Sequence, residues 1–365
     1  MKVLHLIGAA NPGGAETFAL RLFDGLAHAG VAQHVCARPR SWLAGQLATR
    51  PIPTTLAPFG GWLDQHLHPL LPWGTQAVVN ATVRTFAPDV VMAWMNRGAV
   101  FLPRGAVPTV ARLGGFYPLK YYRRADWLVG NTQAICDHCV AHGWPRPRVR
   151  HIGNFTPAPP STWRAARDAT RAAWGWGPAD VGVVQMGRLH PVKGADLTLA
   201  ALATLPAHIK VALVGTGPLR DALEAQARAL GVADRVTFPG WMDTVDAAAA
   251  AADIWLAPSR HEPLGNTVLD AWAHSVPIAA SRVGGMAVLI EPDVSGVLFA
   301  PDDAPALAHA LLRLATDAAL RTRVAQGGHA AWQRDFRAEK IVADYINFFE
   351  TVLTPTKDYA PHDRP

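Results

Sequence analysis

The chain has few cysteines: three among 365 residues, too few to build a disulfide framework. Cys136 and Cys139 form a CxxC pattern with His138 inside it, but no second pair of ligands follows at a spacing suited to zinc. The segment TQAICDHCVAHG is therefore predicted to be a helix in which the cysteines act as small hydrophobic residues. No metal site is expected.

Long apolar runs are also missing. Proline, glycine or charged residues interrupt every apolar stretch before the roughly 20 residues that a membrane-spanning helix needs. The first residues, MKVLHLIGAANPGG, include one lysine and an apolar stretch too short for a signal peptide, so we interpret them as a first buried strand and a glycine loop. These features favour a cytoplasmic protein.

Signatures of nucleic-acid recognition are absent as well, since the sequence has no zinc-finger pattern and no RNA-reading motif. The net charge is nevertheless +6 and the sequence pI about 9.5, a balance that favours anionic partners. Nucleotides, phosphorylated lipids and an anionic membrane surface fit this charge. Peripheral association with the inner face of a membrane is therefore a further prediction, and no nucleic-acid partner is expected.

The chain does contain a regular alternation of short apolar runs and longer amphipathic stretches. KVLHLI (2–7) predicts a strand, and in the following stretch Phe18, Leu22 and Leu26 recur every four residues, as on one face of a helix. Repetition of this unit predicts an α/β protein with doubly wound, parallel sheets. At roughly 150 residues per domain, the length suggests two such domains with a ligand cleft between them.

A proline-rich stretch, NFTPAPPSTW (154–163), interrupts the alternation and predicts a linker. The predicted organisation is a first domain over 1–155, a linker over 156–179, a second domain over 180–335, a helix over 336–354 that packs back toward the first domain, and a frayed tail over 355–365.

The first strand leads into the loop GAANPGGAE (8–16), in which Gly13 and Gly14 allow a ligand to approach the backbone at a helix start. Glu16 falls in the first helical turn, where the helix dipole favours a carboxylate. The dinucleotide pattern GxGxxG is absent, so a plain strand-to-helix turn is the alternative interpretation.

Two loops of the second half contain charged residues beside glycine. GRLHPVKG (187–194) places Arg188 and Lys193 in a short loop bounded by glycines, an arrangement that suits a diphosphate. SRHEPLGNTVLD (259–270) contains two carboxylates, Glu262 and Asp270, about two helical turns apart. The GTGP loop (215–218) and the glycines of SRVGGMAVL (281–289) are interpreted mainly as structural turns.

Together these loops resemble the donor domain of a retaining glycosyltransferase of family four. The resemblance extends from QMGRLHPVKGADLTLAAL through LVGTGPLRDALEAQARALGVADRVTFPGW to LAPSRHEPLGNTVLDAWAHSVPIAAS, and the GGAE loop adds to it. It implies the GT-B fold of two facing Rossmann-like domains. It also implies that Arg188 and Lys193 bind the donor diphosphate and that Glu262 holds hydroxyls of the transferred sugar.

Further donor contacts follow from the same resemblance. The backbone at Leu264, Gly265, Asn266 and Thr267 would approach sugar and phosphate, Met242 would lie near the base, and Gly13 and Gly14 would lie over the diphosphate. Asp270 stands where the family usually has a second glutamate for the ribose, so the contact with the ribose is altered.

A second departure concerns the acceptor domain, where many family members have a histidine near the reacting carbon. Here the region reads VPTVARLGGFYPLKYYRRAD, with Arg112 and no histidine. Arginine is not a base at neutral pH, but Arg112 suits an anionic acceptor group, as do Lys120, Arg123 and Arg124. A solvated basic face is the alternative interpretation of these cations.

The sequence therefore predicts metal-independent, retaining transfer of a sugar from a UDP or GDP donor to a saccharide or lipid-linked acceptor, in the synthesis of lipopolysaccharide or another surface glycan. Glu262, Arg188 and Lys193 are the predicted catalytic residues. A nucleotide-sugar epimerase of the same fold and a non-catalytic sugar-nucleotide-binding protein remain alternatives. A dinucleotide-dependent oxidoreductase and a glycoside hydrolase fit the loops less well.

Overall fold

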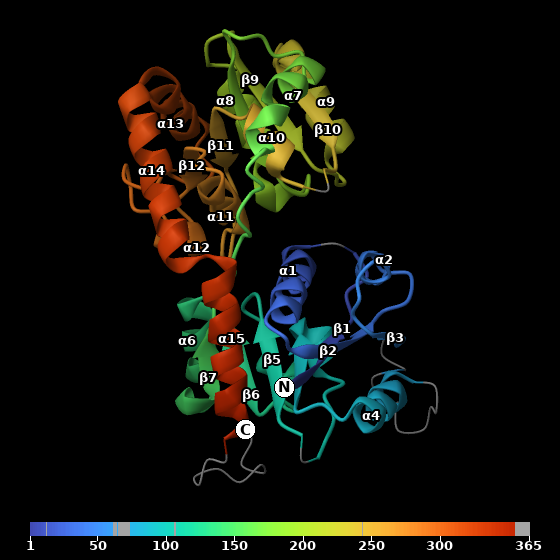
Figure 1. Cartoon of the computed structure of the whole chain (residues 1–365). Coiled ribbons are helices and arrows are strands. Elements are labelled where there is room, and N and C mark those ends of the chain that lie inside the picture. Colours follow the sequence, from blue (N-terminus) through green and yellow to red (C-terminus); the bar gives the residue numbers. More distant parts are fainter. Residues whose placement is uncertain (12, 61–63, 65–73, 106, 243, 355–365) are drawn as a thin grey trace. The chain divides into compact units, whose positions relative to one another are not determined.

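The structure is a computed structural model that describes residues 1–354 except 12, 61–63, 65–73, 106 and 243. It consists of two compact units (Figure 1). Unit 1 contains Met1–Phe155 and the segment from Ala338 onward, and unit 2 contains Thr156–Arg337. The predicted frayed tail over 355–365 lies outside the described residues.

Unit 1 is built on a seven-stranded parallel sheet with the order β3-β2-β1-β4-β5-β6-β7. Its strands are β1 (Lys2–Ile7), β2 (Ala32–Ala37), β3 (Thr54–Leu56), β4 (Val90–Trp94), β5 (Thr109–Leu113), β6 (Trp127–Gly130) and β7 (Val149–His151). Its helices are α1 (Gly14–His28), α2 (Trp42–Leu47), α4 (Thr75–Phe86), α5 (Met95–Ala99), α6 (Gln133–Ala141) and α15 (Ala338–Leu353), with 3-10 turns η2 (Leu119–Tyr121) and η3 (Arg146–Arg148).

Unit 2 repeats the plan with six parallel strands in the order β10-β9-β8-β11-β12-β13. Its strands are β8 (Val181–Met186), β9 (Ile209–Val214), β10 (Val236–Gly240), β11 (Ile254–Ala257), β12 (Ile278–Ser281) and β13 (Val297–Phe299). Its helices are α7 (Arg167–Ala173), α8 (Ala195–Leu202), α9 (Arg220–Ala229), α10 (Asp246–Ala251), α11 (Asn266–Ala273), α12 (Gly284–Leu289), α13 (Ala304–Thr316) and α14 (Ala318–Asp335), with η4 (Trp163–Ala166), η5 (Pro191–Lys193) and η6 (Ala233–Arg235).

Both sheets reverse their strand order at one point, between β1 and β4 in unit 1 and between β8 and β11 in unit 2. This order is that of a doubly wound Rossmann sheet, and ligands of such sheets bind beyond the carboxyl ends of the strands at the reversal. The prediction of two doubly wound parallel sheets is therefore confirmed, and the topology marks the loops after β1, β4, β8 and β11 as the places to search for a site.

The core of unit 1 includes a helix that is remote in sequence. Ile341, Tyr345 and Phe349 of α15 are buried in the same cluster as Val3 and Phe23, so the last helix belongs to the first unit (Figure 1). Inside this cluster the Arg112 guanidinium lies over the rings of Phe18 and Trp94. None of the described helices is both long and apolar enough to cross a membrane.

Cys136 and Cys139 lie in helix α6 and are buried, as predicted for small hydrophobic residues. Burial raises the pKa of the Cys139 thiol to about 12. Both side chains therefore have the properties of core residues.

Candidate active site

The two loops that the sequence singled out follow the two strands at the reversal of the unit 2 sheet. Residues 187–194 follow β8, and residues 258–265 follow β11. The structure brings their charged residues into contact, because Lys193 Nζ forms an ion pair with Glu262 Oε2. Glu262 is mostly buried, with 14% of its side chain exposed. Two predicted catalytic residues are thus neighbours, although 69 positions separate them in the sequence.

Arg188 differs from Lys193 in its surroundings. Its side chain is exposed, and it forms no hydrogen bond or ion pair with the part of the chain that the structure describes. An exposed guanidinium at the carboxyl end of β8 has all its N–H donors available for an anion. Arg188 and Lys193 therefore present two cations at the edge where a Rossmann sheet binds ligands.

Buried polar contacts fix the backbone of the first loop. Gln185 Nε2 donates to the Lys193 carbonyl at 2.9 Å, and Thr198 Oγ1 donates to Gln185 Oε1 at 2.7 Å. Gly194 has a φ of +66°, and a Cβ at this position would lie 2.1 Å from the Pro258 carbonyl oxygen. Only glycine therefore lets the two loops approach this closely.

The GTGP turn supports the same loop, in agreement with its structural interpretation. Leu189 N donates to the Thr216 carbonyl at 2.9 Å, and Leu219 N donates to the Leu189 carbonyl at 3.2 Å. The turn thus holds the backbone beside Arg188 and has a supporting role.

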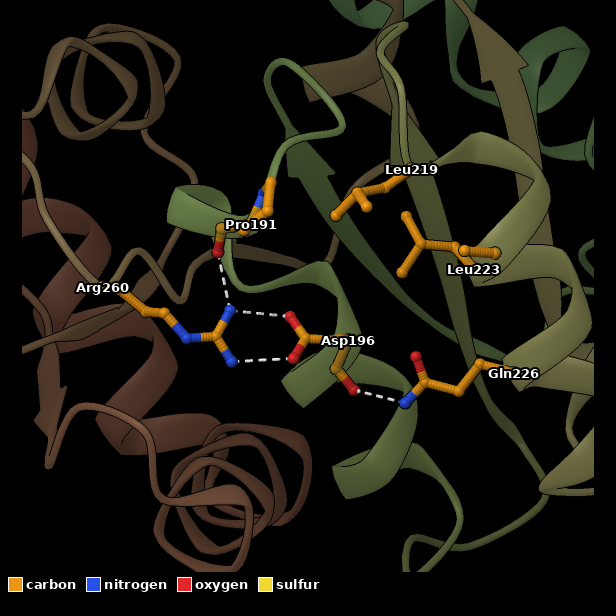
Figure 2. Close-up of a pocket in the computed structure, with 7 residues that line it drawn as sticks. Pro191, Asp196, Leu219, Leu223, Gln226 and Arg260 are labelled. Carbon is orange, nitrogen blue, oxygen red and sulfur yellow. Dashed lines mark hydrogen bonds and ion pairs between the residues drawn. The ribbon is translucent and has the colours of Figure 1, made fainter.

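Arg260 links the two charged loops, a role that the sequence analysis missed. Its Nη1 donates to the Pro191 carbonyl at 2.6 Å, and its two terminal nitrogens bond both oxygens of Asp196 at 2.8 and 2.7 Å (Figure 2). Its Nε forms a further ion pair with Asp302 at 2.5 Å. The guanidinium holds the pKa of the Asp196 carboxyl below its usual range. A cavity of about 240 Å³ adjoins this cluster and is lined by Leu219, Leu223 and Gln226 among others.

The start of helix α11 forms the rest of the second loop. Gly265 precedes the helix with a φ of +94°, and Asn266 and Thr267 occupy its first turn. Thr267 Oγ1 accepts a hydrogen bond from Trp255 Nε1 at 2.6 Å. Backbone N–H groups at such a helix start attract anions.

The glycines of SRVGGMAVL are more than turn residues, because they begin helix α12 against the Glu262 loop. Gly285 N donates to the Glu262 carbonyl at 3.0 Å, and a Cβ on Gly285 would lie 2.2 Å from the Leu264 carbonyl oxygen. The small residues therefore allow α12 to support the segment from Glu262 to Leu264. The sequence showed the glycine pair but not this contact.

Asp270 lies one turn into α11, where Thr156 Oγ1 donates to its Oδ1 at 2.8 Å. Met242 follows β10 and is half-buried against the apolar cluster of this unit. Because the strands are parallel, the residues after β8, β10 and β11 all lie at one edge of the sheet. The edge thus contains every donor-side residue that the sequence predicted in unit 2.

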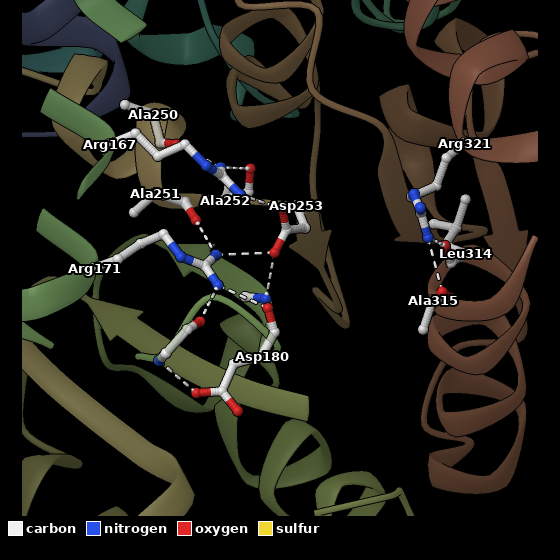
Figure 3. Close-up of polar contacts among 12 residues, drawn as sticks. Arg167, Arg171, Asp180, Ala250, Ala251, Ala252, Asp253, Leu314, Ala315 and Arg321 are labelled. Atoms are coloured by element: carbon white, nitrogen blue, oxygen red, sulfur yellow. Dashed lines mark hydrogen bonds and ion pairs between the residues drawn. The ribbon is translucent and has the colours of Figure 1, made fainter. Parts of the chain in front are cut away.

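The segment after Thr156 was predicted to be a linker, but the structure places 156–179 within unit 2 and finds η4 and α7 in it. Arg171 is buried and donates to Asp253 at 2.9 Å and to the carbonyls of Ala251 and Asp180 (Figure 3). Arg167 bonds the same carboxylate at 2.6 Å. The proline-rich composition predicted a linker and gave no sign of these arginine contacts, because Ala251 and Asp253 lie far along the chain from Arg171.

Unit 1 contains the other predicted site residues. Gly13 precedes helix α1 in an extended conformation, and a Cβ on it would lie 2.8 Å from Glu16 Oε2, so the glycine makes room for that carboxylate. Gly14 is the first residue of α1. Burial raises the pKa of Glu16, while its own backbone amide and the charge of Arg112 act in the opposite direction.

Arg112 occupies a different environment from the one predicted. It is 1% exposed, its Nε donates to Tyr345 Oη at 3.0 Å, and its Nη2 bonds Asn154 Oδ1. These contacts tie α15 to the sheet, and the surface left for an acceptor is small. The acceptor-binding role of Arg112 stays a prediction beside this structural role, which the sequence gave no means to foresee.

Lys120 and Arg123 are exposed, and the Lys120 ammonium lies 5.2 Å from the ring centre of Tyr121. Two other polar side chains, Tyr117 and Asn131, follow strands of this sheet and lie at its carboxyl edge. Tyr117 follows β5 and has a pKa raised by burial and by the charge of Glu16. Asn131 follows β6 and is 5% exposed, and its Oδ1 has no hydrogen-bond partner among the described residues.

Comparison with known proteins identifies the class. Residues 180–317 match the family model of glycosyl transferases group 1. Over the whole length, the chain is similar to the lipopolysaccharide core biosynthesis glycosyltransferases LpsE and LpsD of Rhizobium meliloti (strain 1021). LpsE is 36% identical over 95% of this chain and 98% of its own, and LpsD is 33% identical over 96% and 98%.

The chain therefore belongs to the glycosyl transferases group 1 family and is a glycosyltransferase. Its fold is also that of the crystal structure of Anabaena Alr3699/HepE in complex with UDP and glucose. The TM-score is 0.83 at 22% identity, over 96% of this chain and 100% of that one. The resemblance to a GT-B glycosyltransferase predicted from the loops is confirmed.

Proposed function

We propose that this glycosyltransferase transfers a sugar from a nucleoside diphosphate donor, UDP or GDP, to an acceptor hydroxyl with retention of the anomeric configuration. The observation that supports the proposal most directly is the grouping of Arg188, Lys193 and Glu262 at the reversal of the unit 2 sheet. Two cations and one carboxylate match the two chemical parts of such a donor, its diphosphate and its sugar hydroxyls.

In this proposal Arg188 and Lys193 bind the diphosphate and stabilise the charge that it develops as the bond to the sugar breaks. Glu262 accepts hydrogen bonds from hydroxyls of the transferred sugar. The N–H groups at Gly265, Asn266 and Thr267 add backbone donors at a helix start. In the structure Glu262 forms an ion pair with Lys193. A bound diphosphate would replace Glu262 as the partner of Lys193.

The proposed transfer step balances in protons and electrons without a separate base. The bond between the anomeric carbon and the phosphate oxygen breaks, the acceptor oxygen bonds to that carbon, and the departing phosphate oxygen takes the acceptor proton. This route also agrees with an acceptor region that has no histidine in VARLGGFYP. The two cations stabilise the leaving group, and we therefore propose that the reaction is metal-independent.

The proposed base and ribose contacts are Met242 and Asp270. A carboxylate suits the ribose hydroxyls, and the bond from Thr156 to Asp270 Oδ1 fixes its orientation. UDP is favoured over GDP by the likeness to Alr3699/HepE, which has been crystallised with UDP-glucose. The proposed contact of Gly13 and Gly14 with the diphosphate rests on the sequence resemblance alone.

We propose a saccharide or lipid-linked acceptor of the lipopolysaccharide core type. The two Rhizobium relatives act in lipopolysaccharide core biosynthesis by their names, and each matches nearly the full chain. Glu16, Tyr117 and Asn131 give unit 1 polar groups for acceptor hydroxyls, and Lys120 and Arg123 give it exposed cations for anionic groups.

A transfer assay with EDTA present tests the reaction. The enzyme is incubated with UDP-sugars or GDP-sugars and a lipopolysaccharide core acceptor, and the product is analysed by NMR for its anomeric configuration. Nucleoside diphosphate release that requires acceptor, with retained configuration, supports the proposal. Conversion of the donor without acceptor would instead identify a nucleotide-sugar epimerase, and an inverted product would remove the retaining mechanism.

Peripheral membrane association is a separate part of the proposal, based on the net charge of +6. The test is sedimentation with anionic vesicles at increasing salt, because surface electrostatic attraction is screened by salt. Binding at low salt that is lost at high salt is the expected result. Failure to sediment even at low salt would exclude this association without affecting the transfer chemistry.

A further inference from the structure

Besides the cavity beside Arg260 in unit 2, a cavity of about 580 Å³ occurs in unit 1. The proposed sugar transfer does not use it. Its polar lining consists of Gln76, Asn80, Arg84, Arg104 and Arg124, and two apolar side chains complete it. The volume is within the usual range for small-molecule pockets, and three of the five polar groups are cations.

The cavity lies away from the edge where the polar groups Glu16, Tyr117 and Asn131 occur. Arg104 precedes strand β5, Arg124 precedes β6, and Arg84 is near the end of the helix that precedes β4. Parallel strands begin at a common edge, so these arginines lie at the amino edge of the sheet. Glu16 and Asn131 belong to the carboxyl edge, so the cavity is separate from these polar groups.

Arg124 is half-buried, unlike the exposed Arg84 and Arg104, and uncharged acceptors hold its guanidinium in place. Arg124 Nη1 donates to Gln76 Oε1 at 2.5 Å and to the Leu102 carbonyl at 3.4 Å. Gln76 is oriented in turn, because its Nε2 donates to Asn80 Oδ1 at 3.1 Å and to the Phe101 carbonyl at 3.3 Å. This network fixes one guanidinium at the wall of the cavity before any ligand arrives.

The charge of the cavity is not balanced by its own lining, which contains no carboxylate. Arg84 and Arg104 are exposed and form no hydrogen bond or ion pair within the residues that the structure describes. Burial and the charge of Arg104 lower the pKa of Arg124, a sign that the positive charges oppose one another. The Oδ2 atom of the neighbouring Asp126 accepts hydrogen bonds from the backbone N–H and the hydroxyl of Thr109.

We propose that this cavity binds a phosphate group, as inorganic phosphate or as a phosphate monoester on a larger molecule. Guanidinium groups bind phosphate oxygens through paired, charge-assisted hydrogen bonds, and a doubly charged anion offsets the repulsion among the three arginines. The Gln76 and Asn80 side chains add uncharged polar groups to the lining. The proposal concerns a second site and does not depend on the identity of the sugar donor.

Hydrogen exchange measured by mass spectrometry tests the proposal at the level of the site. The full chain is titrated with inorganic phosphate against chloride at equal ionic strength, and exchange is followed in segments 75–86 and 100–105. The test variant is Arg84→Gln with Arg104→Gln, which leaves the bonded Arg124 in place. The matched control is Arg150→Gln, an exposed arginine on β7 of the same unit.

Phosphate is expected to protect both segments in the unaltered chain and in the control. The double variant should bind phosphate at least about tenfold more weakly, because it loses two charge-assisted partners. Absence of protection in the unaltered chain, or equal protection in the double variant, would overturn the proposal. The loops 187–194 and 259–270 are followed in the same experiment and again with UDP added, so a failure of the proposed donor site is seen separately from the result at the cavity.

A second arm identifies the source of the phosphate. The same three proteins are sedimented with vesicles of phosphatidylcholine and phosphatidic acid, with phosphatidylcholine alone as the blank. Binding to phosphatidic acid that the double variant loses would assign the site to a lipid headgroup. Protection by inorganic phosphate without vesicle binding would assign it to a soluble or saccharide-borne phosphate.

Discussion

Arg188 and Lys193 lie in the same short loop but differ in their contacts. Lys193 is paired with Glu262, whereas Arg188 is exposed without a partner among the described residues. Removal of the Arg188 side chain therefore costs the fold little, and its effect on the reaction can be measured separately from stability.

The substitution Arg188→Ala is expected to lower kcat/KM for transfer by about 100-fold or more, the magnitude for loss of one preorganised group that stabilises developing charge. The melting temperature should change by no more than about 2 °C, as for other surface substitutions. Arg228→Ala, at an exposed arginine of α9, is the matched control and should leave both quantities unchanged. Transfer at the unaltered rate in Arg188→Ala would remove this residue from the mechanism.

His5 is a buried polar residue in the core of unit 1. Trp94 Nε1 lies 3.5 Å from its Nδ1, and its Nε2 lies 3.2 Å from Gln33 Oε1, so Nε2 donates and Nδ1 accepts. Burial lowers the pKa of His5 to about 3 from the usual 6.5. The native protein therefore keeps this imidazole neutral in mildly acidic solution.

The lowered pKa predicts a pH dependence of stability. Above pH 6.5 both native and unfolded His5 are neutral, and stability is unaffected. Below that value the unfolded state binds a proton that the native state excludes. The free energy of unfolding should therefore fall by about 1.4 kcal/mol per pH unit from this residue until the pH nears the native pKa. Nitrogen NMR of histidine-labelled protein, assigned with His5→Gln, should show a neutral ring at about pH 5. An imidazolium at that pH would contradict the account.

At the scale of elements, the charged loops after β8 and β11 are connected by Arg260. Its bonds to Pro191 and Asp196 on one side and to Asp302 on the other fix the positions of Lys193 and Glu262 without adding a group to the site. Arg260 is thus a positioning residue, and its loss should affect donor binding more than the chemical step.

The substitution Arg260→Ala is expected to raise KM for the donor severalfold, with a smaller decrease in kcat, and to lower stability by about 1–3 kcal/mol through the lost charge-assisted bonds. Arg260→Lys should restore only part of the effect, because an ammonium cannot bond both oxygens of Asp196 in the planar geometry of guanidinium. Arg313→Ala, which removes a single surface pair with Asp293, is the control. A decrease in kcat alone would show that Arg260 acts in the chemistry and not in positioning.

Local patterns were sufficient to predict the alternation of strands and helices, and the charged loops follow strands as expected. The short apolar run KVLHLI led directly to β1. Helices α13 and α14 were not assigned from the sequence, although Asp303 and Asp317 cap their starts with side-chain hydrogen bonds. Those cap signals at 303 and 317 could have located both helices.

The remaining differences arise from contacts between residues far apart in the chain. Arg112 suggested an acceptor group because it lies in the region where many family members have a histidine, but Tyr345, 233 positions later, accepts its Nε hydrogen bond in the core. Arg260 stood beside Glu262 in the sequence, and its partner Asp196 lies 64 positions earlier. Neither pairing follows from periodicity or composition, because each depends on how the units fold.

At the scale of the whole molecule, the last helix completes the first unit. Helix α15 buries Ile341, Tyr345 and Phe349 in the unit 1 core, and its Tyr345 hydroxyl satisfies the buried Arg112. The chain therefore passes from unit 1 through all of unit 2 before the first core is complete.

The substitution Tyr345→Phe is expected to destabilise unit 1 by about 1–3 kcal/mol, since it leaves a buried guanidinium N–H without an acceptor. Tyr121→Phe, at a partly buried tyrosine of η2, is the matched control and should have little effect. Chemical unfolding followed by tryptophan fluorescence measures both. Equal stability of Tyr345→Phe and the unaltered protein would show that this bond does not hold α15 in place.

We propose that unit 2 binds a nucleoside diphosphate through Arg188, Lys193 and the segment from Glu262 to Asp270. The most direct measurement is a thermal-shift panel with UDP, GDP, ADP, CMP and NAD at equal concentration and with EDTA present. A ligand that binds only the native state raises the melting temperature according to its affinity. We expect stabilisation by one nucleoside diphosphate, UDP first, and loss of that shift in Arg188→Ala. Stabilisation by NAD alone, or by none of the five, would contradict this proposal.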